Sequence, residues 1–151
     1  MRDFFLIIAG YASIFNKLDK SDDMILPGTF NNLITPIKLL YGHNKQLALG
    51  ELLFAQEDNY GLYIEAVLFC HEAWQRSLVR RIIKKDISGL SIGLLVEENK
   101  RLEGVNLISQ GQLCEVSITS QPINKDCQID FAEFFVVGDS GLEPPTSTMS
   151  R

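Results

Sequence analysis

The chain has 151 residues, of which 46% are hydrophobic and 22% are charged. This length and composition fit one soluble globular domain with a sizeable core and leave too little chain for two ordinary domains. The formal net charge of −5 argues against a general binder of the nucleic-acid backbone, which needs a basic face, and no apolar run is long enough to span a bilayer.

Cysteine usage and the first residues point to an ordinary reducing compartment. Cys70, Cys114 and Cys127 are an odd number without paired spacing, so we expect no disulfide framework, no C-x-x-C metal site and no cofactor. The opening stretch MRDFFLIIA has too short an apolar run for a signal peptide, and Asp3 stands where such a peptide is basic. We therefore predict that the chain starts with a strand.

Strands dominate the predicted secondary structure. They are expected at residues 4–15 with a bend at Gly10, 37–41, 47–56, 62–69, 90–96, 105–109 and 113–119. The strands at 47–56 and 62–69 are separated by turn residues and should pair as a hairpin. Polar residues at 16–23 and 97–104 predict a loop and a turn.

Two helices are predicted among these strands. A short helix at 26–33 would begin at Pro27. The stronger helix, at 72–85, has apolar residues at helical spacing, and its basic residues are interpreted as a solvated face that also suits the helix C-terminus. The apolar residues are Trp74, Leu78, Val79, Ile82 and Ile83. Seven strands with these helices predict a mainly β (α+β) fold, a closed or nearly closed sheet with helices packed outside.

The last residues differ from the rest of the chain. Residues 138–151 read GDSGLEPPTSTMSR and hold almost no residues suited to a core. This composition predicts a disordered tail, which looks foreign to the domain. We therefore place the domain at residues 1–137.

Residues 89–93 read GLSIG and match the G-x-S-x-G nucleophile elbow of the α/β-hydrolases. That fold needs repeated βα units and a histidine after the serine, whereas His43 and His71 both precede Ser91. The elbow interpretation therefore fails. Because a catalytic triad is defined by geometry and not by chain order, Ser91 remains a candidate nucleophile, with the two histidines as candidate bases.

Glu115 is a candidate for the group that orients the base. It lies within the predicted strand at 113–119, where a glutamate is disfavoured unless it is exposed or paired. The neighbouring Cys114 alternates with Val116 and Ile118. This pattern predicts that Cys114 is a buried, inert thiol and not a nucleophile.

Five segments resemble, in the same order, the motifs of the prohead (head maturation) serine proteases of tailed bacteriophages, a family related to the herpesvirus assemblins. They read GYASIF at 10–15, DMILPGTF at 23–30, LLYGHN at 39–44, GLSIG at 89–93 and LCEVSITSQPIN at 113–124. Carried over by position, the resemblance makes Ser91 the nucleophile, His43 the general base and Glu115 the group that orients the imidazole. His71 is the alternative third member, because assemblins use two histidines. The histidine segment departs from the family in Gly42 and Asn44.

The resemblance implies an assemblin-like fold, a roughly seven-stranded β-barrel surrounded by helices. It also implies a serine endopeptidase of phage capsid maturation, which cleaves the scaffolding segment of the major capsid protein and itself. Such an enzyme acts inside the assembling procapsid in the bacterial cytoplasm. Its partners would be the capsid protein, the portal and procapsid, and a second copy in a homodimer, with no nucleic acid or membrane. The alternative is a catalytically inactive module for capsid assembly or scaffold binding, from a truncated prophage gene.

Overall fold

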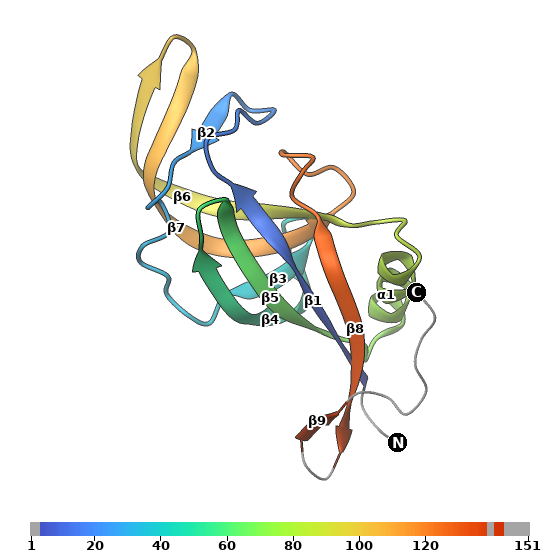
Figure 1. Cartoon of the computed structure of the whole chain (residues 1–151). Coiled ribbons are helices and arrows are strands. Elements are labelled where there is room, and N and C mark those ends of the chain that lie inside the picture. The colour runs from blue at the N-terminus through green and yellow to red at the C-terminus, as the bar shows by residue number, and fades with distance from the viewer. Residues whose placement is uncertain (1–3, 139–140, 144–151) are drawn as a thin grey trace.

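The structure is a computed structural model in which residues 4–138 and 141–143 are described. Within these residues the chain forms nine strands and one helix (Figure 1). The elements are β1 (Phe4–Ile14), β2 (Asp23–Ile25), β3 (Lys38–Tyr41), β4 (Asn44–Glu57), β5 (Gly61–Phe69), α1 (Ala73–Ile83), β6 (Gly89–Leu102), β7 (Val105–Thr119), β8 (Ile129–Gly138) and β9 (Gly141–Glu143). The mainly β prediction is confirmed, whereas β2, β8 and β9 were not predicted.

All nine strands belong to one strongly bent sheet. Neighbouring strands follow the order β2-β7-β3-β4-β5-β1-β8-β9, and β6 pairs with β7. The pairs β2–β7 and β3–β7 are parallel, and the other pairs are antiparallel. Strand β7 therefore has β6 on one side and both β2 and β3 on the other.

The sheet is open, so the prediction of a β-barrel surrounded by helices is wrong. The start of β6 meets the segment before β8 through one isolated bridge, between Gly89 and Gln128. One neighbouring backbone hydrogen bond, from Leu90 N–H to the Cys127 carbonyl, measures 2.9 Å. A barrel needs a continuous ladder with a fixed stagger, and no such ladder joins β6 to β8 in the described residues.

The helix predicted at 72–85 is present as α1. The side-chain oxygen of Gln75 accepts hydrogen bonds of 3.0 Å from the backbone N–H groups of His71 and Glu72, which satisfies donors at the helix start. The predicted apolar face packs into the core, where Leu78, Val79 and Ile82 are buried.

The helix predicted at 26–33 does not form. The chain makes a turn there instead, and Gly28 adopts a φ of 94°, which no α-helix contains. The carboxylate of Glu57 accepts hydrogen bonds from the backbone N–H of Gly28 at 2.8 Å and of Phe30 at 2.7 Å. These bonds attach the turn to β4, and Phe30 stacks on Phe15 in the core.

The predicted hairpin at 47–69 is confirmed as β4 and β5, but the three strands predicted at 90–119 form a single long hairpin. The polar residues at 97–104 continue β6 and turn only at Glu103 and Gly104, which have φ values of 51° and 82°. Residues 97–102 are exposed, and the end of the hairpin projects from the sheet in Figure 1. Their polarity reflects solvent on both faces of a strand, not a wide turn.

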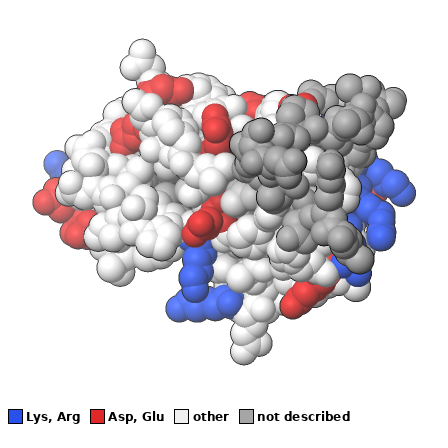
Figure 2. All heavy atoms as spheres, turned by 90° about the horizontal axis from the view of Figure 1, so that it is seen from below, with Lys and Arg blue, Asp and Glu red and all other residues white. Residues whose placement is uncertain are grey.

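The core lies on one face of the sheet and fixes β6 and β7 in place. Its fully buried strand residues come from β1 and β3 to β7 and include Leu6, Ile8, Leu39, Leu49, Leu62, Ile64, Leu68, Leu90, Val116 and Ile118. Acidic and basic side chains are interspersed on the face seen in Figure 2. In the described part of the chain, no helix has the length and apolar character needed to cross a membrane.

The tail predicted at 138–151 falls mostly outside the described residues. Within that range, Gly138 ends β8 and Gly141–Glu143 forms β9. The boundary placed at residue 137 remains a prediction.

Candidate active site

The structure brings Ser91, His43 and Glu115 together in one hydrogen-bonded row. His43 Nε2 lies 3.1 Å from Ser91 Oγ, and His43 Nδ1 lies 2.5 Å from Glu115 Oε1. Because a carboxylate only accepts hydrogen bonds, the imidazole proton lies on Nδ1, and the lone pair of Nε2 faces the serine hydroxyl. In this arrangement the imidazole can accept the proton of Ser91.

The pairing of β6 with β7 sets the positions of Ser91 and Glu115. In the antiparallel ladder Ser91 lies opposite Ser117, and Gly93 lies opposite Glu115. Residues directly opposite each other project from the same side of a sheet. Ser91, Ser117 and Glu115 therefore share one face of the hairpin, while Leu90 projects into the core from the other.

A β-bulge at Cys114 allows Glu115 to leave the core face. The ladder passes from the pair Gly93–Glu115 to the pair Leu94–Leu113, so Cys114 is an extra residue in β7. Leu113 is thereby buried and Cys114 is exposed. The prediction of a buried Cys114 is wrong because it assumed uninterrupted alternation.

A two-residue turn between β3 and β4 carries His43. Gly42 and His43 have φ values of 58° and 60°, the combination found in type I′ hairpin turns. Glycine adopts this conformation without strain, which gives a physical reason for Gly42 in the histidine segment. On the preceding strand, Tyr41 lies opposite Ile118 of β7, so the turn stands beside the strand that carries Glu115.

Gly93 provides the space that the Glu115 carboxyl group occupies. A Cβ atom added to Gly93 would lie 2.4 Å from Glu115 Oε1 and 2.9 Å from its Cδ, closer than real Cβ contacts. The second glycine of GLSIG is therefore explained by the packing of a carboxylate across a hairpin. It is not part of a strand-to-helix turn, as it would be in a hydrolase elbow.

The imidazole forms the open side of the site. Ser91 is only 5% exposed, and the side chain of Glu115 is 14% exposed. The His43 side chain is 41% exposed. Of the three groups, His43 is therefore the one most accessible to solvent.

His71 lies elsewhere, just before α1. Its ring stacks on Phe69 with a centroid separation of 5.8 Å and meets the edge of Phe5 at 6.3 Å. The group in contact with His43 Nδ1 is Glu115. The geometry therefore favours Glu115 over His71 as the third member.

Sequence reasoning missed Ser117, which contacts both His43 and Glu115. Its hydroxyl accepts a hydrogen bond of 2.9 Å from the backbone N–H of His43 and lies 2.9 Å from Glu115 Oε2. An uninterrupted hairpin that turns at Glu103 and Gly104 would place Val116 opposite Ser91, and the bulge at Cys114 shifts the register by one residue so that Ser117 lies there instead. The position of Ser117 was missed because the hairpin was divided into three strands and because the bulge that sets its register was not predicted.

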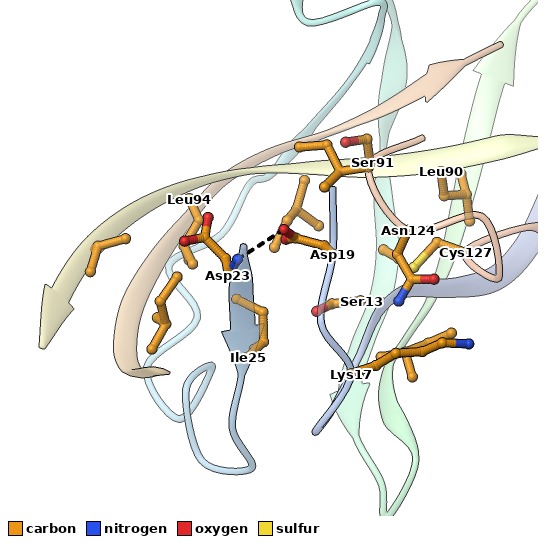
Figure 3. Close-up of a pocket in the computed structure, with 16 residues that line it drawn as sticks. Ser13, Lys17, Asp19, Asp23, Ile25, Leu90, Ser91, Leu94, Asn124 and Cys127 are labelled. Atoms are coloured by element: carbon orange, nitrogen blue, oxygen red, sulfur yellow. Dashed lines mark hydrogen bonds between the residues drawn. The ribbon is translucent and has the colours of Figure 1, made fainter. Parts of the chain in front are cut away.

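A pocket of about 190 Å³ lies next to the site but on the other face of β6. Ser91 contributes to its wall, yet Figure 3 shows the Ser91 hydroxyl and the Leu90 side chain leaving β6 on opposite sides. Asp19 at the pocket accepts backbone hydrogen bonds from Ser21 at 2.7 Å and Asp23 at 3.0 Å, and burial raises its pKa. Asp19 thus holds its own loop together and makes no contact with the Ser91 hydroxyl.

Cysteine alkylation is expected to follow burial. Burial raises the pKa of Cys127 to about 11, which leaves roughly one thiol in a thousand ionised at pH 8, whereas Cys114 is exposed. Iodoacetamide at pH 8 should therefore modify Cys114 of the folded protein at least about 100-fold faster than Cys127. Peptide mapping by mass spectrometry over time measures both rates, with urea-unfolded protein as the control in which the difference disappears. Similar rates in the folded protein would contradict this burial pattern.

Comparison with known proteins assigns the family. The sequence model of the family described as Caudovirus prohead serine protease matches residues 2–136. The prohead protease of Enterobacteria phage HK97 is 27% identical over 135 residues, which cover 82% of this chain and 58% of that protein. This chain therefore spans a little over half the length of the curated relative.

A solved structure shows the same fold. The KSHV protease, crystallised in complex with a hexapeptide phosphonate inhibitor, superimposes with a TM-score of 0.58 at 11% identity, over 86% of this chain and 64% of the other. At this identity the likeness concerns the fold alone, and it confirms the assemblin-like architecture. The resemblance drawn from the five sequence segments is confirmed by the family match. With nearly all of the described residues covered by that match, the chain belongs to the prohead serine proteases of tailed phages.

Proposed function

We propose that this chain is a serine endopeptidase in which Ser91 is the nucleophile, His43 the general base and Glu115 the group that orients the imidazole. The observation that carries this proposal is the row from Ser91 Oγ to His43 Nε2 at 3.1 Å and from His43 Nδ1 to Glu115 at 2.5 Å. The three groups come from separate strands and turns, and they meet in a member of a serine protease family.

The first half of the reaction forms an acyl-enzyme. Ser91 Oγ attacks the carbonyl carbon of the scissile peptide while its proton passes to His43 Nε2. The resulting imidazolium is stabilised by Glu115, which stays ionised. His43 then gives the proton to the leaving amine as the C–N bond breaks, and the acyl group remains on Ser91.

The second half regenerates the enzyme. A water molecule loses a proton to His43 Nε2 and attacks the acyl carbon, and the ester bond to Ser91 breaks as its oxygen regains the proton. Throughout both halves the Nδ1–H bond to Glu115 keeps the same ring nitrogen facing Ser91.

The proposed substrates are the scaffolding segment of the major capsid protein and the protease itself, cleaved inside the assembling procapsid in the bacterial cytoplasm. Family membership supports this assignment. We further propose the portal-containing procapsid and a second copy of the chain as partners. The inactive assembly module is not favoured, because all three reactive groups are present and in contact.

A fluorophosphonate probe tests the nucleophile without a known substrate. Attack by Ser91 Oγ on phosphorus forms an O–P bond and expels fluoride, while the serine proton passes to His43. We expect one stoichiometric adduct, located on Ser91 by mass spectrometry of the digested protein. Labelling on another residue, or none above that of the urea-unfolded chain, would overturn the assignment.

Co-expression with the phage's major capsid protein tests the substrate. Wild-type chain is expected to shorten the capsid protein, and Ser91→Ala, which removes only the hydroxyl, is expected to leave it at full length. Equal shortening by both chains would show that Ser91 is not responsible. If the Ser91 adduct forms but the capsid protein stays intact with wild type, the chain is a serine hydrolase with a different substrate.

A further inference from the structure

Ser117 closes a ring of hydrogen bonds around the candidate base. It is fully buried in β7, directly opposite Ser91. Its Oγ is 2.9 Å from the backbone nitrogen of His43 and 2.9 Å from Glu115 Oε2. The other carboxylate oxygen of Glu115 contacts His43 Nδ1. The Glu115 carboxylate is therefore bonded to His43 in two ways. It contacts the imidazole directly, and it is linked to the backbone N–H of His43 through the Ser117 hydroxyl.

The direction of these bonds follows from the protons available. A backbone N–H can only donate and an ionised carboxylate can only accept, whereas a hydroxyl has one proton and can do both. Ser117 therefore accepts from His43 N–H and donates its single proton to Glu115. Hydrogen bonds linked in this sense polarise and strengthen one another.

Ser117 is the residue that fixes the rotation of the Glu115 carboxylate. Oε2 takes the proton of Ser117, so Oε1 is directed at Nδ1 of His43. Since the Glu115 side chain is mostly buried, loss of the Ser117 proton would leave Oε2 poorly solvated. The His43 N–H would also lose its acceptor at a residue with a positive φ of 60°.

We propose that Ser117 is a positioning residue, which holds Glu115 and the turn at His43 in the arrangement that the general base requires. This inference rests on the proposed function of Ser91, His43 and Glu115. Ser117 does not touch the reacting atoms, because its hydroxyl is occupied by His43 N–H and Glu115. Its effect reaches Ser91 only through the imidazole.

Three substitutions at Ser117 distinguish the effect of losing the hydroxyl from the effect of changing the side-chain volume. Ser117→Ala removes the hydroxyl, Ser117→Cys keeps a similar volume with a weak donor, and Ser117→Thr keeps the hydroxyl. The matched control is Thr29→Val, because Thr29 is also fully buried and its hydroxyl lies 2.7 Å from the Leu26 carbonyl oxygen, away from the candidate site. Any loss of stability caused by deleting a buried hydroxyl is thus measured separately from an effect on the base.

Two readouts are compared, the rate of fluorophosphonate labelling at Ser91 and the downfield proton NMR signal of the His43 Nδ1–H. Ser117→Ala and Ser117→Cys are expected to label about 10 to 100-fold more slowly than wild type, in line with the loss of groups that orient a catalytic base. The Nδ1–H signal should shift upfield and exchange faster in both variants. Ser117→Thr should recover most of the rate and the signal, and Thr29→Val should change neither.

The proposal is overturned if Ser117→Ala and Ser117→Cys fold and keep both the wild-type rate and the wild-type signal. It is also overturned if Thr29→Val slows labelling as much as they do. Failure of the proposed function looks different, because wild type itself would then not be labelled at Ser91. Even then the NMR signal, which needs no turnover, decides whether Ser117 holds the pair of His43 and Glu115.

Discussion

Replacement of His43 by alanine is expected to slow fluorophosphonate labelling of Ser91 by about 10⁴-fold. The hydroxyl of Ser91 has Nε2 of His43 as its proton acceptor at 3.1 Å, and a neutral serine is a weak nucleophile without such a base. A loss of this size corresponds to about 5.5 kcal/mol of transition-state stabilisation. The second-order rate constant for labelling, measured under pseudo-first-order conditions for wild type and His43→Ala, tests this expected loss.

The chain supplies a matched control, His71→Ala. His71 is the other histidine, and its ring packs on Phe69 outside the site, so labelling of this variant should stay within about twofold of wild type. Circular dichroism and thermal melting of both variants show that the fold is retained. Rapid labelling of the His43 variant, or a large loss in the His71 variant, would contradict the assignment of the base.

Substitution of Gly93 by alanine is expected to slow labelling by about 100 to 1,000-fold while the protein stays folded. The new Cβ would lie 2.4 Å from Glu115 Oε1, and the far end of that side chain is what has to move. Displacement of the carboxylate breaks its bond to His43 Nδ1, so the imidazole loses its fixed tautomer and orientation. Labelling kinetics and the Nδ1–H proton signal measure the two effects.

Gly50→Ala distinguishes this effect from general damage to the sheet. A Cβ atom on Gly50 would lie 1.9 Å from the backbone oxygen of Val67, where no flexible group can give way. This variant is therefore expected to lose thermal stability, whereas Gly93→Ala loses reactivity with a much smaller change in melting temperature. Wild-type labelling by Gly93→Ala would show that the Glu115 carboxylate does not need this space.

Short-range sequence patterns were sufficient to predict the elements whose contacts are between residues close together in the chain. The helix α1 followed from apolar residues at helical spacing, and the β4–β5 hairpin followed from strand propensity on either side of a turn. The residues Ser91, His43 and Glu115 came from the order of the sequence segments, and the structure places them in contact.

Long-range pairing decided what the sequence did not reveal. The pairing of β1 with β8 and the parallel pairing of β2 with β7 join segments that are far apart in the chain. No short stretch of sequence contains both partners of either pair. The bulge at Cys114 exchanged the expected burial of Leu113 and Cys114, because one extra residue interrupts a period of two. At Gly28 a bidentate tertiary contact from Glu57 produced a turn where the local pattern favoured a helix.

The register of the β6–β7 hairpin has a consequence for the order in which the site assembles during folding. Ser91, Gly93, Glu115 and Ser117 all lie on this hairpin, whose contacts are sequential and need only a tight turn to form. His43 joins them only when β3 pairs in parallel with β7, across 72 residues of chain, and such distant parallel pairings are slow. We therefore expect the nucleophile and its carboxylate to come into register before the base joins them. On this expectation, a half-folded chain carries an unactivated serine, and reactivity towards a fluorophosphonate appears only once β3 has paired with β7.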